Sequence, residues 1–266
     1  TMTMKESLVP NGKTITLEEL KQVEAQNGNI KAFTEVTRED IIRYAMEMNY
    51  AEFLDLGTGK CAFNTPAFYE LLEYAKEYPE EINWDNVDDS YWEEYQYIMR
   101  ENKALLQYCS LGSLNYVAYT EQGTYGEKVA FVGFPGTQGI TGVIYPYSQM
   151  AISADCENPD AAWDFMRTFY TYDAQKEIGY GIPVNLDAME DVLLKAQQRP
   201  YWIDEDGNKV EYDDTYWIGE DEIIINPLTA ERAQEIKEYI LSVDKLYYYD
   251  SSIVDIIIEE ASPFFA

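Results

Sequence analysis

Apolar side chains recur every three or four positions in several stretches of the chain, and this spacing is typical of amphipathic helices. Many of these stretches begin at a recognisable cap. Thr16 is followed by Glu19 in the pattern of a capping box, and Thr65 precedes a proline that suits the first turn of a helix. The patterns predict helices over Thr16–Gln26, Thr37–Asn49, Pro66–Tyr78, Asp88–Asn102, Pro159–Tyr172, Leu186–Gln198 and Ala230–Val243, and a last helix that begins at Asp250.

Shorter apolar runs bounded by glycine or proline lie between these helices and predict strands. They cover Ala104–Cys109, Val129–Phe134 and Gln149–Ser153. A hairpin is expected where two further runs flank Asp206-Gly207-Asn208. Its acidic turn resembles a calcium loop at first sight, but Gly207 is misplaced for one, so a hairpin turn is favoured. The fold class predicted is a helix-rich α/β fold.

Charge narrows the possible partners. The 266 residues include 49 acidic and 19 basic ones, a net charge of −30. Nucleic acid and anionic membrane surfaces attract clusters of Lys and Arg, and the sequence shows no such cluster. Neither is therefore expected as a partner.

Catalytic chemistry has little support in the composition. The chain contains no histidine, which removes the commonest general base and most transition-metal sites. The three cysteines have no CxxC spacing, and the glycines from Gly133 to Gly142 do not form a phosphate-binding motif. We expect no catalytic residue, metal site or cofactor. The glycine-rich turns are instead expected to bring backbone close to a ligand.

Aromatic residues are abundant, with 24 Tyr, 10 Phe and 5 Trp. Sugar sites combine flat aromatic platforms with polar groups, and Tyr and Trp supply both. Most aromatics pack in cores, so the candidates are those expected in loops: Tyr50, Phe53, Tyr145, Tyr147 and Trp217. We predict that these five residues line one concave ligand-binding surface.

Five segments, taken in order, resemble motifs of the family 1 extracellular solute-binding proteins of ABC importers, which include the maltose-type proteins. The motifs read T-x-E-E-L, G-K-x-x-F-x-S-x-x-F, K-A-L-L, A-I-S followed by N-P-x-A-A-W-x-F, and G-x-P-V-N. The corresponding segments are Thr16–Leu20, Gly59–Phe68, Lys103–Leu106, Ala151–Phe165 and Gly181–Asn185. The sugar-stacking Trp of the maltose type is missing, because the corresponding stretch reads Ser110-Leu111-Gly112.

The resemblance implies a periplasmic-binding-protein-like fold of type II, of which this chain is mainly the second lobe. Residues 1–114 and 173–266 would form that lobe, and residues 115–172 would cross back to a first lobe. Strands around residues 129–153 would then lack their natural neighbours. The implied function is a lipid-anchored or periplasmic, extracytoplasmic receptor that encloses a small solute, most simply an oligosaccharide, and presents it to an ABC permease. Such a receptor is not an enzyme, and this chain alone would bind sugar weakly.

Two other functions compete with the receptor. Pairs such as Asp88-Asp89, Glu93-Glu94 and Asp213-Asp214 contain the residue types of a glycoside hydrolase. Adjacent acids on a helix point in different directions, which favours a solvated surface instead. A permease-independent carbohydrate-binding adhesion module is the third possibility.

Overall fold

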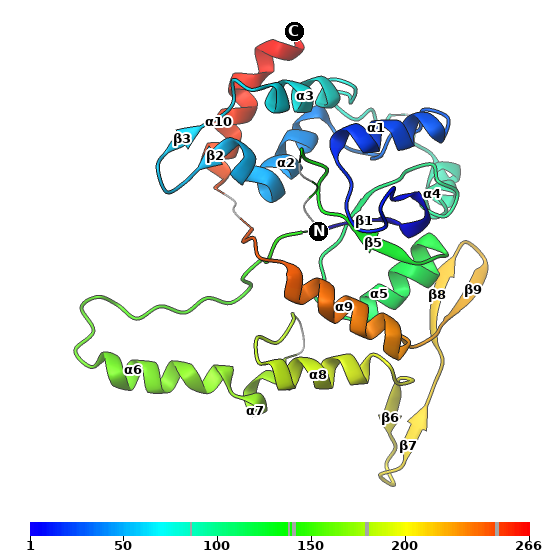
Figure 1. The fold of residues 1–266 in the computed structure, drawn as a ribbon. Helices are drawn as coiled ribbons and strands as arrows, with labels where there is room; N and C mark the ends of the chain where they lie inside the picture. Colours follow the sequence, from blue (N-terminus) through cyan, green and yellow to red (C-terminus); the bar gives the residue numbers. More distant parts are fainter. Residues whose placement is uncertain (86, 138, 140–141, 179–180, 248–249) are drawn as a thin grey trace. The chain divides into compact units, whose positions relative to one another are not determined.

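The chain forms two compact units in the computed structural model (Figure 1), which describes residues 1–85, 87–137, 139, 142–178, 181–247 and 250–266. Unit 1 comprises Thr1–Cys109, Glu127–Ile144 and Val243–Ala266, and unit 2 comprises Ser110–Gly126 and Tyr145–Ser242. Each unit combines helices with short strands, which confirms the helix-rich α/β class. The assignment of residues 1–114 and 173–266 to a second lobe, with residues 115–172 crossing to a first lobe, stays a prediction.

The helices of unit 1 begin at side chains that accept backbone N–H groups. Thr16 and Thr37 each form a reciprocal capping box, with Glu19 and Asp40 respectively. These caps satisfy donors that the first helical turn leaves unpaired. The helices are α1 (Leu17–Gln26), α2 (Arg38–Phe53), α3 (Pro66–Ala75), α4 (Asp89–Tyr95) and α10 (Ser251–Ala261). Their starts agree with prediction, whereas α4 ends seven residues earlier than predicted, at Tyr95.

A three-stranded antiparallel sheet lies in unit 1, with β1 (Met2–Lys5) between β4 (Gln107–Tyr108) and β5 (Val129–Phe131). Thr3 is the register partner of both Gln107 and Phe131. The expectation that residues 129–131 lack a strand neighbour is therefore wrong, because β1 pairs with them. A small hairpin of β2 (Leu54–Asp55) and β3 (Lys60–Cys61) follows α2.

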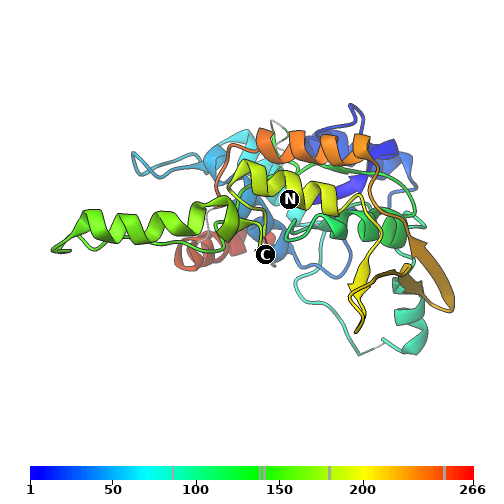
Figure 2. The same cartoon turned by 90° about the horizontal axis from the view of Figure 1, so that it is seen from below.

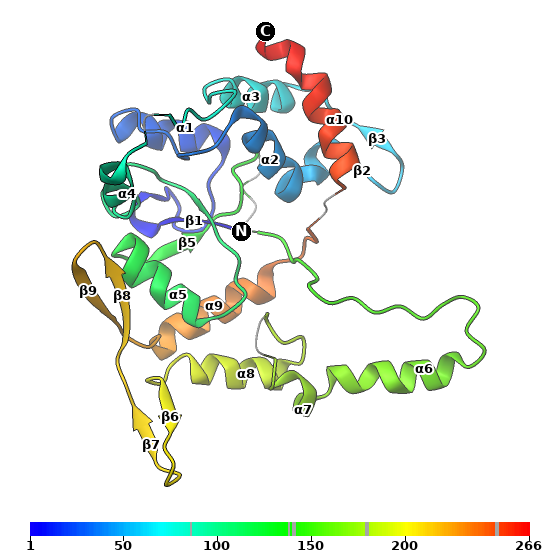
Figure 3. The ribbon, with the colours of Figure 1, turned by 180° about the vertical axis from the view of Figure 1, so that it is seen from behind.

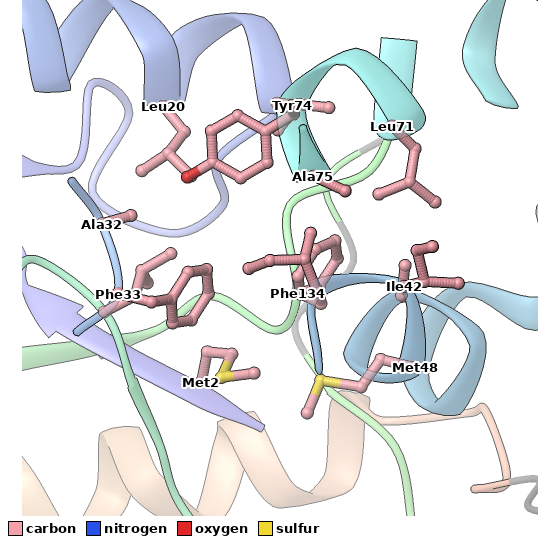
Figure 4. Packing of buried hydrophobic residues seen from close by; sticks show 14 of the residues in the cluster. Met2, Leu20, Ala32, Phe33, Ile42, Met48, Leu71, Tyr74, Ala75 and Phe134 are labelled. Carbon is pink, nitrogen blue, oxygen red and sulfur yellow. The ribbon is translucent and has the colours of Figure 1, made fainter. Parts of the chain in front are cut away.

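The core of unit 1 lies between this sheet and the helices (Figure 4). Met2 of β1 and Phe134, just after β5, contribute side chains from the sheet side, while Leu20, Ile42 and Tyr74 contribute them from α1, α2 and α3. Phe33 and Phe134 stack with ring centroids 6.1 Å apart. The amphipathic faces predicted from sequence thus meet in one continuous cluster, to which Val254 and Ile257 of α10 also belong.

Unit 2 is built from short helices and two hairpins. Its helices are α5 (Asn115–Ala118), which continues as a π-helical segment over Tyr119–Tyr125, α6 (Pro159–Met166), α7 (Tyr172–Gln175), α8 (Leu186–Lys195) and α9 (Ala230–Ser242). Its hairpins pair β6 (Tyr201–Ile203) with β7 (Lys209–Glu211), and β8 (Asp214–Ile218) with β9 (Asp221–Ile225). The first hairpin was predicted. The predicted strand over Gln149–Ser153 does not form, and these residues are largely exposed, without a strand to pair with.

Helices α8 and α9 of unit 2 lie side by side (Figure 2), and each contributes buried side chains. Arg232 of α9 forms an ion pair with Glu121 at 2.6 Å, and both side chains are largely buried. By contrast, α6 contains no buried residue, and in the described parts of unit 2 its main contacts are with the short 3-10 helix Arg167–Tyr170 that follows it (Figure 3). The apolar side chains of α6 are therefore largely exposed.

Candidate functional site

A break in α2 places a polar side chain in the interior of unit 1. Asn49 has φ −116° and ψ 18°, outside the helical region, although α2 continues to Phe53. The side chain is buried, with 3% of its surface exposed. Its Nδ2 donates to the carbonyl oxygen of Phe134 at 3.0 Å, whereas its Oδ1 has no hydrogen-bond partner within the described residues. A buried acceptor without a partner is costly, and so it calls for an explanation.

Glu52, three residues further along α2, holds the segment that follows Phe134. Its two carboxylate oxygens accept from Thr137, at 3.1 Å from the backbone nitrogen and 3.0 Å from Oγ1. The carbonyl of Gly136 accepts from the nitrogen of Leu17 at 3.1 Å, at the start of α1. The segment over residues 134–137 is thus held between α1 and α2.

Gly136 is needed for this approach. A Cβ at this position would lie 2.5 Å from Asn49 Nδ2 and 2.5 Å from Glu52 Oε1, closer than real contacts allow. The glycine-rich turns were expected to bring backbone close to a ligand. At Gly136 the structure brings backbone close to two polar side chains instead.

A small cavity opens beside these groups, with a volume of about 20 Å³. This is room for roughly one water-sized group. Polar and charged side chains from three segments line it together with an apolar wall. The lining residues are Leu17, Ala45, Asn49, Glu52, Phe53, Ala67, Glu70, Leu71, Phe134, Pro135, Gly136 and Thr137. We call this the Asn49 pocket.

The five predicted ligand-binding residues are divided between the two units. Phe53 lines the Asn49 pocket, but it is buried and its ring packs edge-on against Phe68. Tyr50 is half-buried on α2. Tyr145 and Tyr147 are 64% and 72% exposed in a segment of unit 2 without regular structure, and Trp217 is 59% exposed on β8. That all five line one surface stays a prediction.

Three of these residues lie in regular elements rather than in loops. Tyr50 and Phe53 were expected past the end of a helix near Asn49, and this is wrong because α2 resumes after the break and ends at Phe53. Trp217 is a strand residue, paired in register with Glu222. The loop placement is correct for Tyr145 and Tyr147.

The acidic groups singled out in the sequence have structural partners. Asp88 caps α4 through the nitrogen of Tyr91, and Asp213 forms an ion pair with Arg199. Asp204 accepts from the backbone nitrogens of Asp206 and Asn208, which lowers the pKa of its carboxyl and fixes the hairpin turn. Among the described residues, no group of three or more His, Cys, Asp or Glu side chains is placed to hold a metal ion.

Glu24 and Cys109 are among the buried groups of unit 1 whose pKa values are shifted. Burial raises the pKa of Glu24, although its carboxylate accepts from the nitrogen of Ala32 at 2.7 Å and from the Tyr74 hydroxyl at 2.9 Å. Burial also raises the pKa of the Cys109 thiol to about 11, which keeps it protonated and unreactive at neutral pH. Neither group borders the Asn49 pocket, and both serve packing.

Sequence reasoning missed Asn49, Glu52 and Thr137, which are polar groups of the pocket. Their only sequence signal is Asn49 itself, a polar residue at the end of an apolar helical pattern. That signal is equally compatible with a helix end, which is how it was interpreted.

Comparison with known proteins adds no assignment. The chain matches no family model, and no curated protein is significantly similar to it. In the part of the chain that the structure describes, no helix combines the length and the apolar character needed to cross a membrane.

Proposed function

We propose that this chain is part of a non-catalytic, extracytoplasmic receptor for an ABC importer, in which a carbohydrate is enclosed between two lobes. The proposal keeps the type II binding-protein architecture that the sequence motifs imply. Four of these motifs coincide with helix starts, where Thr16, Thr65, Asn158 and Asn185 each accept a backbone N–H. The motifs therefore mark elements in the expected order.

The observation that carries the proposal is the exposed apolar surface of unit 2. Most of the large apolar side chains exposed among the described residues belong to this unit, although it has fewer residues than unit 1. On α6, Trp163 and Phe165 are 52% and 65% exposed. Complete burial of such a side chain would contribute roughly 1.5–3 kcal/mol to the free energy of unfolding, and the exposed side chains of α6 do not make this contribution. Exposed apolar side chains in such number are typical of an interaction site, and a first lobe would cover them.

The exposed Tyr145 and Tyr147 add the chemistry of a sugar site. Each presents a flat ring and a hydroxyl on a segment that is not fixed in a core. An aromatic ring stacks on the C–H face of a sugar, and the hydroxyl can exchange hydrogen bonds with the sugar. Exposure of both side chains fits a ligand that arrives from solvent.

The adhesion-module alternative is favoured by one feature of unit 1. Trp84 and Trp92 stack with ring centroids 6.3 Å apart and an interplanar angle of 10°, and both are about half exposed. A flat aromatic surface of this kind suits a polysaccharide chain. If it is the main binding site, the Trp92→Ala variant loses sugar binding, whereas the Tyr147→Ala variant retains it.

Ligand-observed NMR with a panel of mono- and oligosaccharides tests the proposal, because it detects the weak binding expected of one part of a two-lobed site. We expect at least one sugar to receive saturation from the chain, and the Tyr147→Ala variant to weaken that signal. Tyr69→Ala is the control, since Tyr69 is also an exposed tyrosine but lies on α3 of unit 1. Equal loss in both variants would contradict the assignment of Tyr147.

A further inference from the structure

We propose that the Asn49 pocket binds one monovalent cation of about the size of a water molecule, potassium or ammonium. This inference concerns unit 1 alone and does not depend on the proposed function. It begins from Asn49 Oδ1, a buried acceptor with no partner among the described residues. Asn49 also lines the cavity, so a donor or a cation bound there would satisfy this lone pair.

The hydrogen-bond donors around the pocket are already engaged. Asn49 Nδ2 donates to Phe134, and both the backbone nitrogen and the hydroxyl of Thr137 donate to Glu52. The carboxylate and amide oxygens of the lining are therefore the groups that can still accept hydrogen bonds or bind a cation. These oxygens would repel an anion. They would bind a cation or a group that donates N–H hydrogen bonds.

Charge selects a cation over a neutral donor. Glu52 forms no ion pair among the described residues, and its carboxylate is half-buried. Glu70, the other acid of the lining, pairs with Lys21 at 3.4 Å. The pocket thus retains about one uncompensated negative charge inside a protein of net charge −30. One monovalent cation neutralises it, and the low local dielectric strengthens the attraction.

The size and the ligand set argue against divalent ions. Calcium takes six to eight oxygen ligands, often from several carboxylates, and magnesium demands a near-octahedral shell with several waters. A cavity of about 20 Å³ holds roughly one water-sized group and leaves no room for such a shell. Potassium and ammonium are both close to water in size, and the single charge of either matches the one uncompensated carboxylate of the lining, whereas a divalent ion would leave an excess positive charge.

Occupation of the pocket would join three segments of unit 1. Asn49 lies at the break of α2, Glu52 holds Thr137, and the carbonyl of Gly136 binds the start of α1. A cation held by Asn49 and Glu52 would therefore tie the break in α2 to residues 134–137. We expect the ion to stabilise the folded chain, because it binds the assembled pocket and not the unfolded chain.

Thermal unfolding of the whole chain in different chloride salts tests the inference. Potassium, ammonium, sodium and choline chlorides are compared at equal ionic strength, so that general screening of the acidic surface is the same in each. We expect potassium or ammonium to raise the unfolding midpoint by about 2–4 °C over choline. A potassium-only or an ammonium-only response identifies which of the two the pocket prefers.

Two variants separate the pocket from the rest of the acidic surface. Glu52→Gln keeps an acceptor for Thr137 but removes the charge, and it should abolish the ion-specific shift. Glu73→Gln removes an exposed charge from α3, where Glu70 also lies, and should leave the shift intact. Gly136→Ala, whose Cβ would meet Asn49 and Glu52, should also abolish the shift.

The inference is overturned if the midpoint is the same in all four salts, which would mean that water alone occupies the pocket. It is also overturned if the shift survives in the Glu52→Gln variant.

Discussion

Single residues in unit 1 show how burial and hydrogen bonding compete. Glu24 is a buried carboxyl that accepts hydrogen bonds from Ala32 and Tyr74, and Tyr78 extends the network by a contact of 2.9 Å to Tyr74. Burial nevertheless dominates and raises the pKa of Glu24 above its ordinary value. The folded state therefore binds the Glu24 proton more tightly than the unfolded state does.

The shift makes a signed prediction about pH. The stability contributed by protonated Glu24 is fully present below the pKa of the unfolded chain, and it is lost as pH rises through the higher pKa of the folded state. The unfolding free energy of the wild type, relative to a Glu24→Gln variant, should therefore increase as pH falls from 7 towards 4.5. Urea unfolding at several pH values measures this difference. A difference that does not change with pH would contradict the shift.

Gly136 gives a second prediction at this scale. Its substitution by alanine places a Cβ 2.5 Å from Asn49 and Glu52, so one of these side chains or the backbone must move. We expect a loss of about 1–3 kcal/mol in the free energy of unfolding, as overpacking usually causes. Gly57→Ala is the control, because its Cβ would meet only Asp55, at 3.3 Å. Equal stability of the two variants in urea would show that residues 134–137 can shift to accommodate the Cβ without a cost in free energy.

At the scale of elements, caps decide where the helices of unit 1 begin. Thr37 accepts from the nitrogen of Asp40, and the Asp40 carboxylate accepts from the nitrogen of Thr37. Replacing Thr37 with alanine should cost about 1 kcal/mol, whereas serine, which keeps the hydroxyl, should cost much less. Chemical denaturation of both variants measures this. Equal losses would mean that the methyl group matters and the cap does not.

Cap signals explain why the helix starts could be predicted and some strands could not. A cap is local, so Thr16, Thr65 and Asp250 mark their helices without knowledge of the rest of the chain. A strand requires a partner, and Gln149–Ser153 has none in the part of the chain that the structure describes. The hairpin of β8 and β9 was missed, since its turn at Gly219 lacks an Asn-Gly or Asp-Gly signal. The Asn49 pocket was missed because it depends on contacts between segments 85 residues apart.

The exposure of α6 has a consequence for its dynamics. It contains no buried residue, so its helix rests on the Asn158 cap and on local hydrogen bonds. Isolated helices of this length are marginal in water. Amide hydrogen exchange should therefore be orders of magnitude faster in α6 than in α2, whose Ile41 and Ile42 are fully buried. Similar protection of the two helices would show that α6 is already covered in this chain.

At the scale of the whole molecule, the two units differ in how completely they bury their apolar residues. Unit 1 has a continuous core from β1 to α10, while unit 2 leaves aromatic side chains on α6 and on its irregular segments exposed. In the proposed receptor this difference is functional, because a first lobe would cover the exposed surface and supply the other half of the sugar site. Binding to this chain alone then yields only part of the contact free energy.

We propose that the chain binds a carbohydrate without transforming it. The most direct test is an NMR titration with the sugar that gives the strongest signal in the panel. The spectrum of the same sample is recorded again after overnight incubation. If a complete site binds at ~1 μM, or about −8 kcal/mol, half of that free energy leaves a dissociation constant near ~1 mM. The account predicts saturable binding in the millimolar range and an unchanged sugar spectrum. New reducing-end signals would show hydrolysis, and either these or the absence of saturable binding for every sugar would contradict the account.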